Sequence, residues 1–390
     1  SVRVVADGAR GLPPFDMAIF DEAHKTTGPH GGTFAYALND DNLPIAKRLF
    51  LTATPRHYDI NNRDREGDFK IVSMDDETLY GKVSYKLPFA EAARRDIICS
   101  YKILISVITT DELNTYLLNH GITLVDRDQL AVRWVANQLA LKRAIEKHDV
   151  SKIITFHSRV RTAQAFVDAS SHGIARHIND FSVFHVNGEQ PASERDDTIT
   201  AFRDAAKGLI ANARCLTEGV DVPAVDMVAF VDPRKSRVDI AQAVGRAMRK
   251  APNKTVGYVV VPLFLDQKKD ESIEAALERS DFDEVANVVN AMREQDDLLI
   301  DIIRELRESK GRGEIFNPRR LRGSVEVIGP SLSLDTIAEA VDVQIIERLG
   351  SSWDEMFGRL VAYKQHYGDC LVPDGYSDKK LNSWVKTQRW

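Results

Sequence analysis

Short apolar runs, separated by polar turns, mark the first hundred residues. Met17–Phe20 and Arg48–Thr54 are such runs, the second stopped by Pro55, and a longer run covers Tyr101–Thr109. Runs of this length with polar flanks are typical of strands buried on both faces of a parallel sheet. Further elements are predicted at the strand Phe69–Ser73 and the helix Phe89–Asp96.

The second half of the chain alternates strand and helix patterns more regularly. It opens with a long amphipathic helix at Asp128–His148. Strands are then predicted at Lys152–Phe156, Ser182–Val186, Gly208–Ala211, Met227–Val231 and Thr255–Val261, with helices at Val160–Ser171, Ser193–Arg203 and Ile240–Met248. This alternation indicates a parallel sheet covered by helices.

The composition changes towards the C-terminus. Residues 270–309 read as charged helices, and Gly311–Pro330 is rich in Gly, Pro and Arg, which is typical of a linker. The tail, Ser351–Trp390, concentrates aromatic residues on two helical faces around a turn at Tyr367–Pro373. It is predicted to be a small helical module with an aromatic core.

The overall composition is that of a globular protein in a reducing compartment. The chain is 43% hydrophobic and 28% charged, and its formal net charge is −6, which argues against a generally basic nucleic-acid-binding surface. No apolar run is long enough to span a bilayer, so no membrane partner is expected. Its three cysteines are far apart, which favours a reducing cytosol and a cytoplasmic location.

Two adjacent acids, Asp21 and Glu22, follow the first predicted strand. The carboxyl ends of strands in open α/β sheets are where ligands bind. One acid there can hold a magnesium ion while the next orients and deprotonates a water molecule. The alternative is a buried strand followed by an exposed acidic turn.

Several short motifs occur in the order found in superfamily 2 helicases, which the chain resembles over residues 1–265. The segments that resemble motifs II, III, IV, V and VI are Asp21–His24, Thr52–Thr54, Ile153–Ser158, Cys215–Pro223 and Gln242–Arg249. Leu79–Val83 and Ala90–Tyr101 also resemble the branch that contains restriction-enzyme motor subunits. The resemblance implies an α/β fold with two RecA-like parallel-sheet domains, the first incomplete, with ATP between them.

The resemblance implies roles around ATP and Mg²⁺. Asp21, with Glu22 beside it, would bind Mg²⁺, Glu22 would activate the attacking water, and His24 would connect the nucleotide site to neighbouring motifs. Phosphoryl transfer depends mainly on in-line placement and neutralised charge. Gly219 and Asp221 would contact nucleotide and nucleic-acid backbone, although both are also common turn residues.

Arg246 and Arg249, with Gln242 at the matching spacing, would act as arginine fingers. Residues three apart project from one side of a helix, here the helix beginning near Asp239. A permanently charged, forked guanidinium suits a γ-phosphate. The alternative is a solvated pair of helix arginines.

The remaining motif residues are expected on the nucleic-acid side or in the coupling between the two sites. They are Thr52, Thr54, His157, Ser158 and Thr217. Thr52 and Thr54 could instead be turn or N-cap hydroxyls, and Ser158 could cap the helix that follows it.

The tail resembles the helicase-associated repeat, with Trp353, Tyr367-Gly368, Val372-Pro373 and Trp384–Arg389 at the matching places. Such repeats imply nucleic-acid binding. The aromatics are better explained as core, because so small a module needs nearly every large side chain to fold. The expected backbone contacts are therefore Lys364, Lys379, Lys380, Lys386 and Arg389.

No Gly-x-x-x-x-Gly-Lys-Ser/Thr loop occurs in the sequence, and only 20 residues precede Asp21. We expect a fragment that begins inside the first motor domain and is inactive alone, whereas its parent is an ATP-dependent helicase or translocase acting on DNA, with RNA left open. The alternatives are a non-catalytic nucleic-acid-binding protein and the motor subunit of a restriction system. The predicted domains are 1–110 and 111–265 (RecA-like), 266–310 (helical extension), 311–345 (linker) and 346–390 (helicase-associated module).

Overall fold

The computed structural model describes residues 13–29, 34–56, 71–120, 129–168, 173–213, 225–232, 236–252, 254–314, 317–331 and 333–389. The chain divides into two compact units, Ser1–Leu87 and Pro88–Trp390. Among the described residues, no helix is long and apolar enough to cross a membrane.

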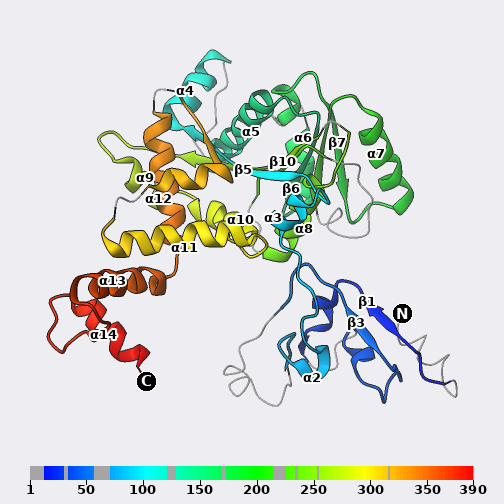
Figure 1. Cartoon of the computed structure of the whole chain (residues 1–390). Coiled ribbons are helices and arrows are strands. Elements are labelled where there is room, and N and C mark those ends of the chain that lie inside the picture. Colours follow the sequence, from blue (N-terminus) through cyan, green and yellow to red (C-terminus); the bar gives the residue numbers. More distant parts are fainter. Residues whose placement is uncertain are drawn as a thin grey trace. The chain divides into compact units, whose positions relative to one another are not determined.

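The first unit is built on a pair of short parallel strands (Figure 1). Strand β1 (Ala18–Phe20) pairs in parallel with β3 (Arg48–Phe50), and β2 (Gly28–Pro29) pairs antiparallel with β4 (Ile71–Val72). Its helices are η1 (Ala23–Thr26), η2 (Tyr36–Leu38) and α2 (Glu77–Tyr80). One face of the parallel pair packs on a small core that contains Ala37, Leu43 and Ile45.

The prediction that these strands are buried on both faces was wrong for this unit. Ile19 and Leu49, which are register partners, are 63% and 40% exposed. Side chains alternate across a strand, so Ala18 and Phe20 reach the small core while Ile19 points to the other face. In the part of the unit that the structure describes, that second face is uncovered.

The second unit contains a seven-stranded sheet in which every pairing is parallel. The strand order is β11-β5-β10-β9-β6-β8-β7. The strands are β5 (Ser100–Thr109), β6 (Lys152–His157), β7 (Ser182–Asn187), β8 (Gly208–Ala213), β9 (Met227–Phe230), β10 (Val256–Leu265) and β11 (Val325–Ile328). The predicted alternation of strands and helices after residue 150 is confirmed.

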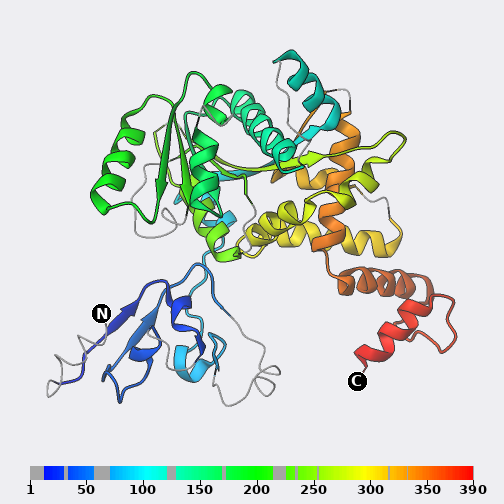
Figure 2. The ribbon, with the colours of Figure 1, turned by 180° about the vertical axis from the view of Figure 1, so that it is seen from behind.

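Helices cover both faces of this sheet (Figures 1 and 2). One face packs on α5 (Gln129–His148) and α6 (Val160–Val167). The other packs on α7 (Ala192–Asp204), α8 (Arg237–Ala247), α9 (Ile273–Arg279), α10 (Phe282–Arg293), α11 (Asp297–Arg312) and α12 (Leu334–Leu349). Three smaller helices are α3 (Phe89–Arg94), α4 (Thr110–Asn119) and η6 (Ile174–Arg176).

Two predicted boundaries differ from the structure. Strand β5, expected in the first domain, lies between β10 and β11 in the sheet of the second unit, so the units meet at 87/88 rather than at 110. The expected linker at 311–345 is instead largely folded, as η7 (Pro318–Gly323), β11 and most of α12. Among the described residues, strand β11 lies at one edge of the sheet, where it pairs with β5.

The C-terminal module is a helical hairpin of α13 (Ser352–Tyr367) and α14 (Lys379–Gln388), as predicted. Its core contains Tyr363, Val372, Leu381 and Val385. Helix α13 packs against α11 (Figures 1 and 2). The two backbones meet at glycines: a Cβ on Gly358 would lie 2.1 Å from the Glu308 carbonyl oxygen.

Candidate nucleotide and nucleic-acid sites

In the first unit, the carboxyl ends of β1 and β3 continue side by side beyond the strands themselves. The Leu51 amide donates to the Phe20 carbonyl, and the Ala23 amide donates to the Leu51 carbonyl, both at 2.9 Å. These bonds extend the parallel pairing and hold the segment after β1 beside the segment after β3. The sequence motifs at Asp21–His24 and Thr52–Thr54 are therefore neighbours in space.

His24 is the centre of this arrangement and is only 2% exposed. Its Nδ1 lies 3.0 Å from the Thr52 hydroxyl, 3.3 Å from the Thr54 hydroxyl and 3.3 Å from Glu22 Oε2. The Thr52 hydroxyl also accepts the Thr54 amide at 3.1 Å. A carboxylate oxygen only accepts, so the contact with Glu22 is a hydrogen bond when Nδ1 carries a proton. The imidazole thus connects the acidic motif with both threonines.

The acidic pair itself has an unusual backbone. Glu22 has φ 51° and ψ 45°, in the left-handed region that side chains with a Cβ seldom adopt. Its amide donates to Asp21 Oδ1 at 2.9 Å. Asp21 is exposed, and the two adjacent carboxylates offer the oxygen ligands that Mg²⁺ prefers. The described residues contain no cluster of three metal-ligating side chains.

A second hydroxyl link beside this motif was missed by sequence reasoning. The Thr26 hydroxyl donates to the Ala23 carbonyl at 2.7 Å, so its lone pairs accept the Tyr80 hydroxyl at 2.8 Å. The Tyr80 ring also packs on Phe50, with centroids 4.9 Å apart. Burial raises the pKa of Tyr80, which keeps the phenol a donor. Only the resemblance of Leu79–Val83 to restriction-enzyme motors pointed to this segment.

In the second unit, the central strands β6 and β9 form a topological switch point. Helix α6, which follows β6, packs on one face of the sheet, and α8, which follows β9, packs on the other. Ligands of open α/β sheets bind in the crevice at such a point. Ser158 lies directly after β6, and Asp232 lies shortly after β9.

These two residues are hydrogen bonded across the switch point. Asp232 Oδ2 accepts the Ser158 amide at 3.0 Å and the Ser158 hydroxyl at 2.6 Å. The Thr162 hydroxyl donates to the same oxygen at 3.2 Å. The alternative of Ser158 as a helix cap is wrong, because α6 is preceded by Arg159, which makes no side-chain cap. Asp232 was not singled out in the sequence, although its place after a buried strand was a signal.

His157 is fully buried, whereas the resemblance places it on the nucleic-acid side. Its Nε2 lies 2.9 Å from the Thr155 hydroxyl, and its ring packs on Phe166 with centroids 4.9 Å apart. The exposed end of β6 is therefore formed by Ser158 and the residues after it. His157 itself is part of the buried packing behind that edge.

Helix α8 carries the predicted arginine motif. Arg246 is buried, and both polar atoms of the Gln242 amide are enclosed without a hydrogen-bond partner among the described residues. The expectation that both arginines project from one helix was wrong for Arg249, because α8 ends at Ala247 and Arg249 is exposed beyond it. Thr217, Gly219 and Asp221 lie outside the described residues.

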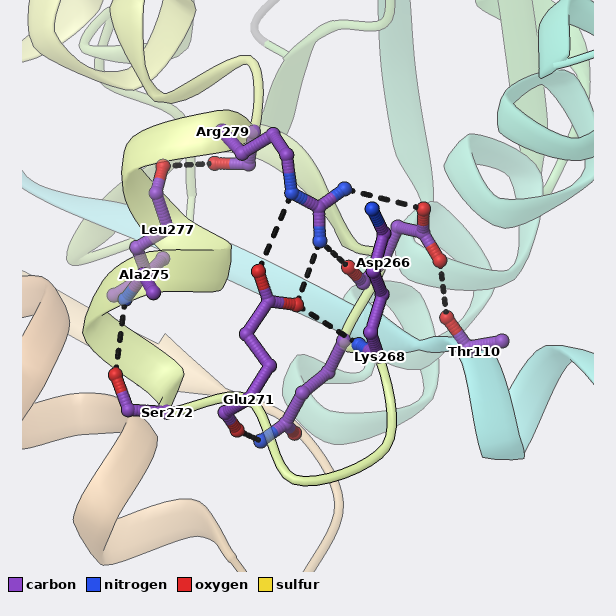
Figure 3. Close-up of polar contacts among 10 residues, drawn as sticks. Thr110, Asp266, Lys268, Glu271, Ser272, Ala275, Leu277 and Arg279 are labelled. Carbon is purple, nitrogen blue, oxygen red and sulfur yellow. Dashed lines mark hydrogen bonds and ion pairs between the residues drawn. The ribbon is translucent and has the colours of Figure 1, made fainter.

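Charged side chains that follow β10 pair with one another, and the Thr110 hydroxyl at the end of β5 joins them (Figure 3). The Arg279 guanidinium donates to Glu271 Oε2 at 2.6 Å and to the Asp266 carbonyl at 2.6 Å, and the Thr110 hydroxyl donates to Asp266 Oδ1 at 3.0 Å. Hydrogen bonds from the Lys268 amide and from Arg279 hold the pKa of Glu271 below its ordinary value. This network braces α9 against the sheet.

In the C-terminal module, two of the five predicted backbone contacts, Lys386 and Arg389, are engaged locally. Lys386 Nζ lies 2.6 Å from Asp374 Oδ1, and the Arg389 guanidinium donates to the Cys370 carbonyl at 3.3 Å. Neighbouring acids and carbonyls thus compete with a phosphate backbone for these two cations.

Two parts of the chain match known families. Residues 136–251 match the helicase conserved C-terminal domain, and residues 350–390 match the helicase associated domain. The first match spans β6–β9 and α8, which carry the switch point and the arginine motif. The second covers α13 and α14.

Similar proteins include helicases and a restriction-modification enzyme. A probable helicase of African swine fever virus is 26% identical over 257 residues, covering 64% of this chain and 26% of that protein. An ATP-dependent RNA helicase of Schizosaccharomyces pombe is 29% identical over 132 residues, covering 34% of this chain and 21% of that protein. Among solved structures, an ATP-dependent Type ISP restriction-modification enzyme bound to DNA aligns with a TM-score of 0.66 at 25% identity, covering 94% of this chain and 25% of that one.

These findings confirm the resemblance drawn from the sequence. The chain is similar to the superfamily 2 helicases over much of its length, and its C-terminal end is similar to the helicase associated domain. It spans about a quarter of the length of the relatives just described.

Proposed function

We propose that this chain belongs to an ATP-dependent nucleic-acid helicase or translocase, in which Asp21 and Glu22 serve ATP hydrolysis. The observation that carries the proposal is the position of His24, whose Nδ1 is shared by Glu22, Thr52 and Thr54. A buried imidazole between an acid and two hydroxyls gives the acidic motif a fixed orientation. The same imidazole links Thr52 and Thr54, at the end of β3, to Glu22.

Each side chain then has a defined role. Asp21 holds Mg²⁺ with Glu22 beside it, and Glu22 orients the attacking water and takes its proton. Arg246 and Arg249 act as arginine fingers together with Gln242, whose buried amide has no hydrogen-bond partner among the described residues and can bond a ligand. Gly219 and Asp221 contact nucleotide and backbone, and Thr52, Thr54, Thr217, His157 and Ser158 couple the nucleotide to the bound strand.

The test is ATP hydrolysis by the protein encoded by the complete reading frame that contains these residues. We expect nucleic acid to stimulate phosphate release, and Glu22→Gln to bind ATP but turn over at least a hundredfold more slowly. Glu77→Gln, an exposed acid in the same unit, is the matched control and should hydrolyse normally. Unchanged turnover in Glu22→Gln would remove Glu22 from this role, and no hydrolysis by the wild type would favour a non-catalytic nucleic-acid-binding protein.

The 390-residue chain itself is proposed to hydrolyse ATP poorly. Its sequence has no Gly-x-x-x-x-Gly-Lys-Ser/Thr loop to supply a lysine and a nest of backbone amides for the phosphates. Robust phosphate release by this chain alone, stimulated by nucleic acid, would contradict that proposal.

The proposed substrate is DNA. The second candidate function is the motor subunit of a restriction system. Both are supported by the alignment with a DNA-bound restriction-modification enzyme over 94% of this chain. Comparing ATPase stimulation by single- and double-stranded DNA and RNA separates the substrates. ATP-dependent displacement of a triplex-forming strand from duplex DNA, together with DNA cleavage, would identify the motor of a restriction system.

A further inference from the structure

Tyr80 ends helix α2, at the point where the chain leaves the first unit. The side chain of Asp76 caps the start of α2, and Gly81 ends the helix with φ 71°, a backbone that favours glycine. Residues 81–86 are exposed, and the second unit begins at Pro88. A displacement of this connecting segment, residues 81–87, therefore acts first on the end of α2.

The ring of Tyr80 is held by aromatic side chains from both parallel strands. Phe50 of β3 lies 4.9 Å from it, measured between ring centroids. Phe20 of β1, which directly precedes Asp21, stacks on Phe50 at 4.9 Å with an interplanar angle of 27°. The three rings form a continuous row, and a ring packed in this way has few alternative rotamers. The hydroxyl of Tyr80 therefore has a defined position.

That hydroxyl reaches the turn that carries the acidic motif. It donates to Thr26 Oγ1 at 2.8 Å, and the Thr26 hydroxyl donates to the Ala23 carbonyl at 2.7 Å. Thr26 is only 5% exposed, so water competes poorly for these bonds. The Ala23 carbonyl belongs to the peptide unit that leads into His24, whose imidazole lies 3.3 Å from Glu22 Oε2. A short chain of bonds thus connects the end of α2 with the acid.

The hydroxyl of Tyr80 is not required to hold its own ring. Phe50 packs on the ring, and among the described residues the hydroxyl forms its hydrogen bond with Thr26 alone. A phenylalanine would pack in the same place without a polar group to satisfy. The hydroxyl therefore adds a specific link to the turn rather than packing.

We propose that Tyr80 is a positioning residue, and that its hydroxyl transmits displacements of the connecting segment through Thr26 to the acidic motif, Asp21–His24. Phosphoryl transfer depends on in-line placement, so a small rotation of the carboxylates changes the rate of hydrolysis. The inference rests on the proposed function and deepens it, because it names a path by which the second unit regulates the acids. The expected signature is a lower kcat under stimulation by nucleic acid, with KM for ATP unchanged.

The test measures ATP hydrolysis by the complete protein with and without nucleic acid. Tyr80→Phe keeps the ring and removes the hydroxyl, so the stimulated kcat should fall about fivefold while KM for ATP stays within about twofold. Basal hydrolysis should change by less than about twofold, because without nucleic acid there is little displacement to transmit. The control is Tyr36→Phe, the same change at a half-buried tyrosine whose ring packs on the small core of the first unit, and both of its rates should stay within about twofold of the wild type.

Thr26 supplies the second arm of the test. Thr26→Val removes the acceptor of Tyr80 and the donor to the Ala23 carbonyl, and should lower the stimulated kcat about tenfold. The double variant Thr26→Val/Tyr80→Phe should be no slower than Thr26→Val alone, whereas independent effects would multiply to about fiftyfold. Thr26→Ser keeps the hydroxyl and should retain at least about half of the wild-type rate.

Hydrogen exchange of the purified 390-residue chain tests the same link without turnover. The Lys25 amide donates to the Glu22 carbonyl at 2.9 Å within this turn, and it should exchange about fivefold faster in Tyr80→Phe. Unfolding curves establish that each variant is folded. Unchanged exchange, multiplying effects in the double variant, or equal losses of the stimulated and basal rates would overturn the proposal.

The two measurements separate this inference from the proposed function. If Glu22→Gln abolishes hydrolysis while Tyr80→Phe matches the wild type in both rates and exchange, only the role of Tyr80 fails. If the wild type is inactive but Tyr80→Phe still speeds exchange at Lys25, the proposed function fails and the link between Tyr80 and the turn stands.

Discussion

His24 Nδ1 and Thr52 Oγ1 lie 3.0 Å apart, although 28 positions separate them in the chain. The contact exists because β1 and β3 are parallel, so that both strands end at the same edge of the sheet. It joins an acid motif and a hydroxyl motif that neither strand could bring together alone. Substitutions at Thr52 should therefore change how His24 holds the acidic motif.

Replacing Thr52 with Val removes the hydroxyl with little change of shape. His24 loses one hydrogen-bond partner and the Thr54 amide loses its acceptor. We therefore expect the free energy of unfolding of this unit to fall by about 1–2 kcal/mol. The measurement is urea denaturation followed by circular dichroism. Thr200→Val, an exposed helix threonine of the second unit, is the control. Equal stability of the Thr52 variant and the wild type would show that the hydroxyl is dispensable for packing.

At position 22, a glycine variant should be more stable than an alanine variant, which is the reverse of the usual order. In ordinary helix positions Ala is better than Gly by about 1 kcal/mol, but left-handed backbone costs any residue with a Cβ about 1–2 kcal/mol. Because Glu22 has φ 51°, Glu22→Gly should be about 1 kcal/mol more stable than Glu22→Ala. Both variants should lose hydrolysis in the complete protein.

The matched control is an acid of the same unit whose φ is not positive. Glu77 begins α2 in the same unit and is not among the residues with positive φ. At this position Ala should be the more stable substitution. A higher stability of Glu22→Ala than of Glu22→Gly would mean that the left-handed turn is not retained in solution.

Much of the second unit could be predicted from the sequence, because its strands are short apolar runs flanked by polar turns. β6, β8 and β9 are buried over their length and cannot be mistaken for solvent-facing strands. The order of the motifs also identified the family. Neither inference required knowledge of which strands pair.

Pairing partners are what the sequence could not supply. β5 was assigned to the wrong unit because its neighbours, β10 and β11, are more than a hundred residues away in the chain. β11 is four residues long and lies among Gly, Pro and Arg, so local composition favoured a linker. The contacts of Ser158 with Asp232 depend on the same kind of non-local pairing.

Asp342 should make stability depend on pH. It is fully buried, and burial raises its pKa to about 6 although Arg322 lies 3.5 Å away and opposes the shift. The folded state therefore holds a proton that the unfolded state, with a pKa of about 3.9, releases earlier. The free energy of unfolding should fall as the pH rises from about 4 through 6, and remain lower above that range.

Asp342→Asn removes this titration. The variant should match the wild type near pH 4 and exceed it at pH 8 by at most about 3 kcal/mol, measured by urea denaturation across that range. Asp335→Asn, an exposed acid of the same helix, is the control and should not show this gain. A loss of stability at pH 8 in Asp342→Asn would show that the charge itself is needed opposite Arg322.

Gly358 offers the sharpest test of how the C-terminal module is held. An alanine in a helix interior ordinarily stabilises by up to about 1 kcal/mol over glycine. Here the added Cβ would lie 2.1 Å from the Glu308 carbonyl oxygen of α11, a distance no real contact allows, and the obstacle is backbone. Gly358→Ala should therefore destabilise the chain and expose the segment between α12 and α13 to limited proteolysis.

Gly323→Ala, whose Cβ would meet nothing within 4 Å, is the same change without the clash and should leave the digestion pattern unaltered. A Gly358 variant as resistant as the wild type would mean that the module is not seated on α11 in solution.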